Sequence, residues 1–557
     1  MKRVWQESYQ EGVPHEININ EYKNIPDILD QSFKDFTDRP SFHCMGKTFT
    51  FGEIDTLSQK FGSYLQNDLG LKKGTRVALM MPNILQYPVA LFGLLRAGMI
   101  GVNVNPLYTG KELEHQLKDS GAEAIIIFEN SAQILQQVIS KTEIKHVITT
   151  SIGDMLGFPK SLIVNFVIKH VKKMVPAWSL PGSIKFNDAL AAGDASKFKK
   201  AKLTLEDTAF LQYTGGTTGV SKGADLTHGN IVANVLQAKS WIAKDLKLGE
   251  EIIITPLPLY HIFSLTANCM IFSSIGALNV LITNPRDIPA FVKELSKWKF
   301  SAFTGVNTLF NVLVNNEDFK KLDFSNLKVT LGGGMAVQKA VAQKWKAITN
   351  KPLIEAYGLT ETSPAACINP IDIAEFNGKI GVPIPSTDMK VIDEEENEVA
   401  IGERGEIAIK GPQVMRGYWN NPAETAKVMT KDGFFKTGDI ATQDEKGYFQ
   451  IVDRKKDMIL VSGFNVYPNE IEDVVTSHPK VLEAAAIGIP NEKSGEIVKL
   501  FVVKKDDSLT KEEVIAFCKT ELTGYKIPKV VEFRDDLPKS NVGKILRKDL
   551  RALEESK

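Results

Sequence analysis

The sequence predicts an α/β protein with at least two domains, in which a large region of helix-covered sheet precedes a smaller β-rich region. A chain of 557 residues is too long for one compact core. Its first half alternates short apolar runs with helical patterns, which favours a parallel sheet covered by helices. A later stretch, residues 405–411, opens a region of alternating strand pattern.

Strands and helices follow one another closely in the first half of the chain. A short strand at residues 49–53 precedes an amphipathic helix up to Leu69, with Leu57, Phe61 and Leu65 on one face. The next elements are strand 76–81, helix 86–98, strand 101–104, helix 111–120 and strand 124–128. Their β-branched strand residues are typical of buried parallel strands. Another strand is expected at 252–255, and strand-to-glycine turns at 303–306 and 330–335.

The composition is that of an ordinary globular protein. Apolar residues make up 43% of the chain and charged residues 24%. Lys and Arg (67) balance Asp and Glu (67), so no overall charge favours nucleic acid. The four cysteines, Cys44, Cys269, Cys367 and Cys518, are far apart, which predicts reduced thiols and no zinc site. We expect neither a signal peptide nor a membrane span, since no uncharged apolar run reaches ~18 residues.

Residues 151–180 are the least regular part of this region. An apolar stretch, residues 162–168, is followed at once by Lys169, His170, Lys172 and Lys173. One interpretation is a surface helix packed on the domain. The other is a basic amphipathic segment that lies on anionic lipid.

A glycine-rich segment, residues 213–223, lies between a predicted strand at 209–212 and a predicted helix at 231–236. Glycines let backbone N–H groups approach a phosphate because no Cβ intervenes. Lys222 adds a cation for a polyphosphate. The P-loop pattern fails, since Ser221 precedes this lysine and Gly223 follows it. A flexible surface turn is the alternative interpretation.

Further segments combine groups that suit a nucleotide. Residues 354–363 place an aromatic ring, hydroxyls and a carboxylate close together, and residues 435–439 end in Asp439, whose carboxylate can accept from ribose hydroxyls. Residues 453–457 are a charge run that would alone indicate a solvated turn, and residues 537–545 contain Lys544.

Together these motifs resemble those of the acyl-adenylate-forming enzymes, the superfamily of acyl-CoA synthetases, luciferases and peptide-synthetase adenylation domains. The likeness extends from residues 77–83 to residues 543–547, and within the superfamily the chain is most similar to bacterial long-chain fatty-acid–CoA ligases. The resemblance implies a large domain of helix-covered sheets with a β-rich subdomain, residues 1–453. A small, hinged α+β C-terminal domain, residues 454–557, would pivot at Lys456 and carry Lys544.

The resemblance also implies roles for individual residues. Lys544 would bridge the substrate carboxylate and the phosphate, His261 would border the acyl pocket, and Glu361 would bind the Mg²⁺ that accompanies ATP. Asp439 and Arg454 would hold the ribose. Thr214, which would also act in catalysis, and Lys222 would steady the departing pyrophosphate. The other residues expected to bind nucleotide are Tyr213, Gly215, Gly216, Thr217, Thr218, Gly219, Gly333, Gly334, Tyr357, Gly358 and Thr360.

The implied activity is the ATP-dependent conversion of a long-chain fatty acid to acyl-CoA through an acyl-adenylate, with release of AMP and pyrophosphate. Mg²⁺, ATP and coenzyme A are the expected cofactor and co-substrates. Ile262, Phe263 and Leu265 would suit the entrance of an apolar tunnel. Because such an acid would be drawn from lipid, we expect a cytoplasmic protein in peripheral contact with the inner face of the cell membrane. Whether the protein forms a homodimer is left open.

Three alternatives remain. The enzyme could adenylate a medium-chain or aryl acid, or it could load a carrier protein. The chain could also be a catalytically silent regulator that binds acyl-adenylate or ATP.

Overall fold

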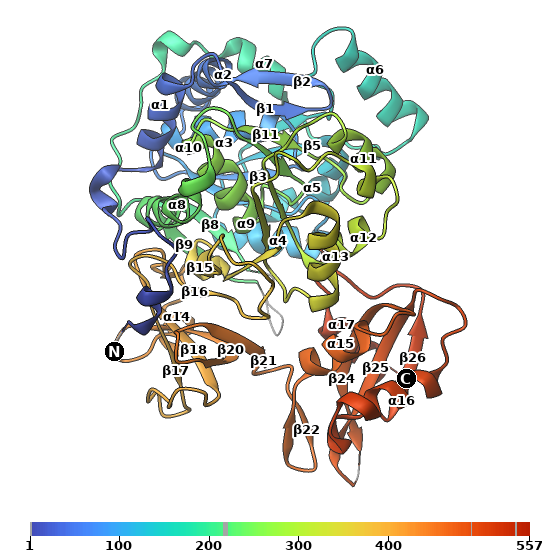
Figure 1. Ribbon diagram of the computed structural model, residues 1–557. Coiled ribbons are helices and arrows are strands. Elements are labelled where there is room, and N and C mark those ends of the chain that lie inside the picture. Colours follow the sequence, from blue (N-terminus) through green and yellow to red (C-terminus); the bar gives the residue numbers. More distant parts are fainter. Residues whose placement is uncertain (1–2, 215–220, 492, 541–542, 557) are drawn as a thin grey trace.

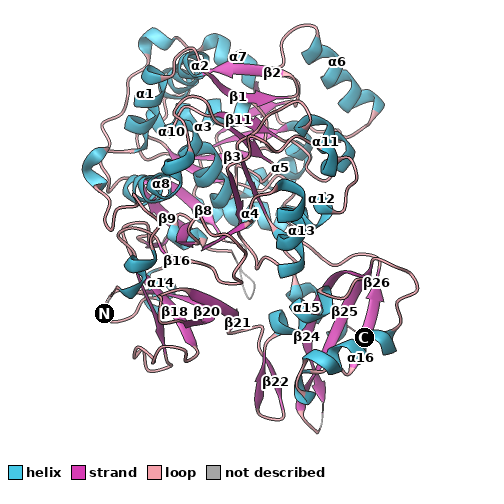
Figure 2. Cartoon of the chain, viewed as in Figure 1, coloured by secondary structure: helices cyan, strands magenta, loops and turns pink. Residues whose placement is uncertain are grey.

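The computed structural model describes residues 3–214, 221–491, 493–540 and 543–556. Figure 1 shows a large body of helices and strands, an antiparallel sheet below it, and a separate group of C-terminal elements at the lower right. Figure 2 shows the strands of the large body enclosed by helices. This mixed α/β arrangement confirms the predicted fold class.

One sheet of the large body carries both ends of the glycine-rich segment. Its strands lie in the order β19 (Gly417–Tyr418), β9 (Gly223–Thr227), β8 (Thr208–Tyr213), β4 (Ile100–Asn103), β3 (Arg76–Met80), β5 (Ala124–Phe128), β6 (His146–Thr150) and β7 (Ile184–Lys185). The strands from β8 to β7 pair in parallel, whereas β8, β9 and β19 are antiparallel. The parallel part follows from the helices that intervene between its strands.

The second sheet of the large body has the order β16 (Val382–Pro383), β15 (Ala365–Ile368), β14 (Ile354–Gly358), β13 (Val329–Gly332), β12 (Ala302–Gly305), β10 (Ile252–Thr255), β11 (Leu278–Leu281), β1 (Pro40–Cys44) and β2 (Lys47–Thr50). Its centre, from β14 to β1, is parallel. The carboxyl ends of β13 and β14 therefore meet at one edge of the sheet, and these ends carry the predicted adenine-binding glycines.

Two smaller sheets follow. The β-rich subdomain is an antiparallel sheet of β17 (Asp388–Ile392), β18 (Gly405–Lys410), β20 (Phe435–Gln443) and β21 (Phe449–Arg454). The C-terminal sheet has the order β23 (Phe464–Val466), β22 (Ile459–Val461), β25 (Gly495–Lys504) and β24 (Val481–Asn491), with β26 (Val530–Arg534) parallel to β25. A hydrophobic core of its own, which includes Ile471, Leu500 and Cys518, supports this C-terminal unit.

Helices are found at the predicted stretches 86–98, 111–120 and 231–236, whereas many of the other helices carried no prediction from the sequence. In the large body the helices are α1 (Ile25–Asp35), α2 (Phe51–Ser63), α3 (Gln86–Arg96), α4 (Gly110–Ser120), α5 (Ala132–Val138), α6 (Lys160–Phe166), α7 (Phe186–Ala192), α8 (His228–Ile242), α9 (Ile262–Ser264), α10 (Ile271–Ser274), α11 (Ile288–Leu295), α12 (Asn307–Val314) and α13 (Lys339–Thr349). The later helices are α14 (Pro422–Val428), α15 (Pro468–Thr476), α16 (Lys511–Glu521) and α17 (Arg547–Glu555). Capping boxes begin α2, at Thr50 and Glu53, and α8, at Thr227 and Asn230.

Two further features concern the cysteines and the length of the helices. All four cysteines are buried and free. Within the described ranges, the helices are too short or too polar to cross a bilayer.

Candidate active site

The glycine-rich segment connects β8 to β9 as the loop of an antiparallel hairpin. Tyr213 pairs with Gly223, and the Thr214 N–H donates to the Lys222 carbonyl at 3.0 Å. The neck of the loop is therefore fixed by backbone pairing. The Tyr213 hydroxyl donates to Asp119 on α4 at 2.6 Å, so this side chain anchors the strand to a covering helix. Five of the predicted phosphate-binding residues lie outside the described residues: Gly215, Gly216, Thr217, Thr218 and Gly219.

A chain of polar contacts links Lys222 to Glu361. The Lys222 ammonium pairs with Glu424 on α14 at 2.5 Å and lies 4.8 Å from the centre of the Tyr418 ring. Hydrogen bonds from Lys222 and Lys427 lower the pKa of Glu424 to about 2. The Tyr418 hydroxyl donates to Glu361 Oε1 at 2.8 Å. The cation predicted for polyphosphate and the carboxylate predicted for magnesium thus share one neighbour, Tyr418.

Glu361 has the surroundings of a carboxylate that needs a cation. Its side chain is buried, and burial raises its pKa. Its backbone carbonyl accepts from the Met415 N–H at 2.7 Å, which holds the short 3₁₀ helix Thr360–Thr362 in place. In the part of the chain that the structure describes, no group of three or more metal-binding side chains gathers. One carboxylate fits Mg²⁺, which prefers few protein oxygens together with phosphate oxygens.

The residues predicted to hold the ribose lie side by side on two strands. Asp439 on β20 is opposite Arg454 on β21, and Arg454 Nε lies 3.1 Å from Asp439 Oδ1. The Tyr357 hydroxyl donates to Asp439 Oδ2 at 2.7 Å. Burial raises the pKa of Tyr357 well above its ordinary value, and the Asp439 charge adds to the rise, so the phenol stays a donor. Arg454 and Tyr357 therefore fix the two carboxylate oxygens of Asp439, one each.

The predicted glycines lie where backbone segments approach closely. A Cβ on Gly333 would lie 3.1 Å from the Ala356 carbonyl and 3.2 Å from the Phe263 ring. A Cβ on Gly358 would lie 1.8 Å from the Pro364 carbonyl, which no side chain permits. Gly334 has a φ of 77°, in the left-handed region. Packing therefore requires glycine at position 358, the positive φ favours it at position 334, and a Cβ at position 333 would need small shifts of its neighbours.

Lys544 extends from a turn that contacts the large body. The Lys544 N–H donates to Ser540 Oγ at 3.1 Å, and the Ser540 N–H donates to the Lys544 carbonyl at 2.7 Å. The Thr308 hydroxyl of α12 donates to the Gly543 carbonyl at 3.0 Å. A residue of the large body thus holds the peptide that precedes Lys544.

The Lys544 ammonium is close enough to the large body to alter its electrostatics. Burial lowers the pKa of Lys544 to about 7, and the Arg454 charge contributes. Burial lowers the pKa of His261 to about 4, and the Lys544 charge contributes. His261 Nδ1 accepts from the Phe263 N–H at 3.3 Å, so the neutral ring carries its proton on Nε2. Lys544, Arg454 and His261 thus converge from three separate parts of the chain.

The turn between β21 and β22 is braced by Arg547. Lys456 lies exposed in this turn, where the Asp457 N–H donates to the Arg454 carbonyl at 2.9 Å. Arg547 Nη1 lies 3.3 Å from Asp453 Oδ1 and 3.4 Å from Asp457 Oδ2, and these two residues lie on either side of Lys456 in the sequence. The same guanidinium contacts Glu472 at 2.6 Å. It therefore ties the start of α17 to the last strand before the turn.

Sequence reasoning missed four residues of this site: Thr308, Tyr418, Glu424 and Arg547. Each acts on a partner far away in the sequence, as Tyr418 does when β19 pairs with β9. No local periodicity marks such a contact. For Arg547 the sequence offered one signal: this second cation follows Lys544 by three residues, at the end of the motif 543–547.

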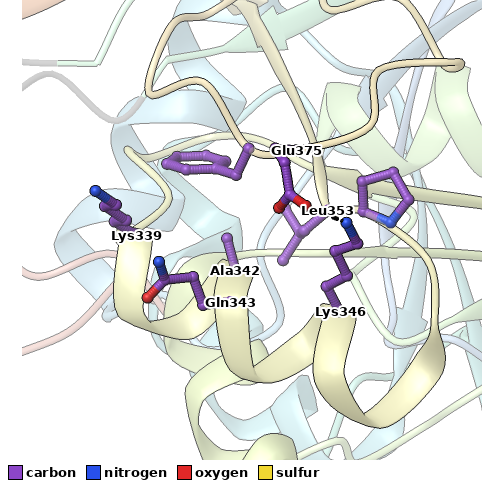
Figure 3. A pocket seen from close by; sticks show the side chains of 8 residues that line it. Lys339, Ala342, Gln343, Lys346, Leu353 and Glu375 are labelled. Carbon is purple, nitrogen blue, oxygen red and sulfur yellow. Dashed lines mark hydrogen bonds and ion pairs between the residues drawn. The ribbon is translucent and has the colours of Figure 1, made fainter.

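The small pocket in Figure 3 is separate from this site. It lies between α13 and the segments around Leu353 and Glu375, and its volume is about 30 Å³, room for water alone. Lys346 pairs with Glu375 at its mouth. It contains none of the predicted site residues.

Comparison with protein families gives matches over most of the chain. The model of the AMP-binding enzymes matches residues 29–419, and that of the AMP-binding enzyme C-terminal domain matches residues 470–544. The chain belongs to the AMP-binding enzyme family. The exact boundary between the two domains, expected at residues 453 and 454, stays a prediction.

Curated relatives of this AMP-binding enzyme match it over nearly its whole length. A long-chain-fatty-acid–CoA ligase of Escherichia coli O157:H7 is 57% identical over 99% of this chain and 98% of the relative. One of Bacillus subtilis is 38% identical, with 100% and 98% covered. Among solved structures, ATP-bound MatB from Rhodopseudomonas palustris has a TM-score of 0.82 at 26% identity, over 96% of this chain and 99% of that one. The Mycobacterium tuberculosis fatty acyl CoA synthetase has a TM-score of 0.69 at 26% identity, over 96% and 98%.

A substitution at Gly543 should loosen the contact with Thr308 and so release the C-terminal unit from the large body. Gly543 has a φ of 81°, and an added Cβ would lie 2.7 Å from Thr308 Oγ1. Gly543→Ala should therefore weaken docking of the C-terminal unit, by about tenfold if the clash costs about 1.4 kcal/mol. Small-angle scattering should show a larger radius of gyration, and trypsin should cut faster after Lys455 and Lys456.

Gly495→Ala is the matched control for this change. Gly495 also has a positive φ, 76°, but the nearest contact of its Cβ would be an ordinary 3.5 Å. If both variants open the enzyme equally, the Thr308 contact does not hold the two parts together.

Proposed function

We propose that this AMP-binding enzyme activates long-chain fatty acids with ATP and transfers the acyl group to coenzyme A. The observation that carries the proposal is the 3.0 Å hydrogen bond from Thr308 to the Gly543 carbonyl, because it holds the residue before Lys544 against the large body that contributes Asp439 of the proposed ribose pair. The lowered pKa values of Lys544 and His261 agree with this placement. Full-length identity of 57% to a long-chain-fatty-acid–CoA ligase supports the substrate class.

In the first step a carboxylate oxygen attacks the α-phosphorus of ATP, and the bond to pyrophosphate breaks. The acid has a pKa near ~4.3, so it is ionised at neutral pH and no general base is needed. The Lys544 ammonium neutralises the carboxylate and an α-phosphate oxygen as they approach. We assign the ribose to Asp439 and Arg454, the adenine to the surroundings of Gly333, Gly334, Tyr357 and Gly358, and the phosphate contacts to Thr214, Lys222 and Thr360.

The residues present fit a magnesium ion bound together with ATP. Glu361 would hold it, with the Tyr418 hydroxyl orienting the carboxylate. When bound, Mg²⁺ supplies positive charge to the phosphate oxygens. Lys222 would leave Glu424 for the polyphosphate, an exchange of one anionic partner for another.

In the second step the coenzyme A thiolate attacks the acyl carbon, the bond to AMP breaks, and the thiol proton passes to solvent. A thiol pKa of ~8.5 leaves a few per cent thiolate at pH 7, enough for a reactive mixed anhydride. Lys544 has no role in this attack. We propose that the C-terminal domain turns about Lys456 between the steps, which would break the contacts of Gly543 with Thr308 and of Arg547 with Asp453.

The acyl chain would lie beyond His261. Ile262 and Leu265 are buried there, and Phe263 lies against Gly333, so the acid would enter an apolar region next to the nucleotide. The medium-chain alternative is represented by a mouse medium-chain acyl-CoA ligase at 31% identity. The higher identity to the long-chain enzymes favours a long acid. Peripheral membrane contact belongs to the same proposal, because a long acid partitions into lipid; a homodimer stays a prediction.

The substrate class can be tested with a panel of acids. Palmitate, octanoate and coumarate should be compared with ATP in a pyrophosphate-release assay, followed by thioester formation with coenzyme A. The proposal expects palmitate to give the largest kcat/KM, since each buried CH₂ is worth about 0.8 kcal/mol. A preference for octanoate or coumarate would favour the alternative acids, and no release with any acid would favour a silent regulator.

Replacement of Lys544 should separate the two half-reactions. In Lys544→Ala we expect adenylation to fall about 10²–10³-fold, the loss typical of one removed electrostatic contact. Thioester formation from supplied palmitoyl-AMP should stay within about twofold of wild type. Lys548→Ala, an exposed lysine on α17, is the control. An equal loss in both half-reactions would contradict the assignment.

A further inference from the structure

One short segment of the large body exposes an unusual amount of apolar surface. Six of the thirteen exposed large apolar side chains in the described residues fall between residues 158 and 174: Phe158 (85% exposed), Leu162, Ile163, Phe166, Val171 and Met174. They lie on α6, on the turn before it, and on the continuing helical segment Val167–Val171. We call this set the α6 surface. Figure 1 shows α6 at the outer edge of the large body, away from the C-terminal elements.

The α6 surface is not a detached helix. The side chain of Asn165 accepts from the Gly153 N–H at 2.8 Å and donates to Asp154 at 2.9 Å. Val164 packs against the main hydrophobic core, and the Lys160 ammonium donates to the Met45 carbonyl. The inner face is thus held by the body, so the outward direction of Leu162, Ile163 and Phe166 is set by the fold.

The charge around these side chains has one sign. No Asp or Glu occurs between Asp154 and Asp188, whereas Lys160, Lys169, Lys172, Lys173 and Lys185 all lie in that interval. Within the described ranges, none of these lysines forms an ion pair with a carboxylate. An otherwise neutral chain therefore carries a local cationic patch beside exposed apolar side chains.

We infer that the α6 surface docks the protein on anionic lipid bilayers. Leu162, Ile163 and Phe166 would enter the boundary between headgroups and acyl chains, and Lys169, Lys172 and Lys173 would contact lipid phosphates. Apolar and cationic side chains on one surface match a bilayer with an anionic headgroup layer, whereas a nucleic acid would leave the apolar set exposed to water. The benefit of such docking rests on the proposed function, since it would give a membrane-dissolved acid a route to the enzyme. The exposure and charge of the α6 surface do not depend on that function.

The test is binding of the full chain to vesicles of phosphatidylcholine, with and without phosphatidylglycerol, by co-sedimentation. Wild type should bind the anionic vesicles more tightly. Lys172→Glu with Lys173→Glu should weaken that binding by at least about 25-fold, because each basic residue contributes about a factor of five. Phe158→Ser with Leu162→Ser should weaken binding about tenfold or more to both kinds of vesicle.

Two control variants alter exposed residues elsewhere. Leu248→Ser removes an exposed apolar side chain, and Lys299→Glu reverses an exposed charge, and both should bind as wild type does. Pyrophosphate release with water-soluble octanoate should be unchanged in every variant, which shows that the site is folded. The inference is overturned if wild type binds vesicles equally well with and without phosphatidylglycerol. It is also overturned if the α6 variants bind as tightly as wild type does. Wild type that binds vesicles but adenylates no acid would refute the proposed function and leave the α6 surface standing.

Discussion

The proposed first step depends on one cation, the half-buried Lys544 ammonium, which is held near the large body by the turn that Thr308 contacts. Burial and the Arg454 charge disfavour a proton on Lys544. That cost is offset once a carboxylate and an α-phosphate lie beside it. A cation carried on a separate unit can also be withdrawn. Two contacts, Thr308 with Gly543 and Arg547 with Asp453, link the unit that carries this charge to the rest of the chain, and the proposed rotation would break both.

The nucleotide side of the site is built by long-range pairing. The β8–β9 hairpin fixes the neck of the glycine-rich loop, and β19 adds Tyr418 to the edge of the same sheet. Tyr418 then contacts both Lys222 and Glu361. Asp439 and Arg454 are brought together by the register of β20 and β21. Sheet pairing thus brings Lys222 and Glu361 to one neighbour, Tyr418, and places Asp439 beside Arg454.

Local patterns predicted most of the fold. The strand at 124–128 and the helix at 111–120 follow from apolar periodicity and caps, and both are found, as β5 and α4. Motif resemblance indicated Lys544, His261 and Asp439 but not what holds them. Thr308, Tyr418 and Arg547 could not be found, because their partners lie far along the chain. The exposure of Phe158 and Phe166 likewise follows from packing rather than from composition.

The most direct measurement is the pH dependence of adenylation alone, in single turnovers with acid and ATP. The free-enzyme pKa of Lys544, about 7, should appear as a basic limb of kcat/KM, because only the protonated amine neutralises the carboxylate and phosphate. Above pH 7 the rate should fall toward tenfold per unit. In Lys544→Arg the limb should disappear, since a guanidinium keeps its charge. A wild-type profile that is flat up to pH 9, or a limb that persists in Lys544→Arg, would contradict the account.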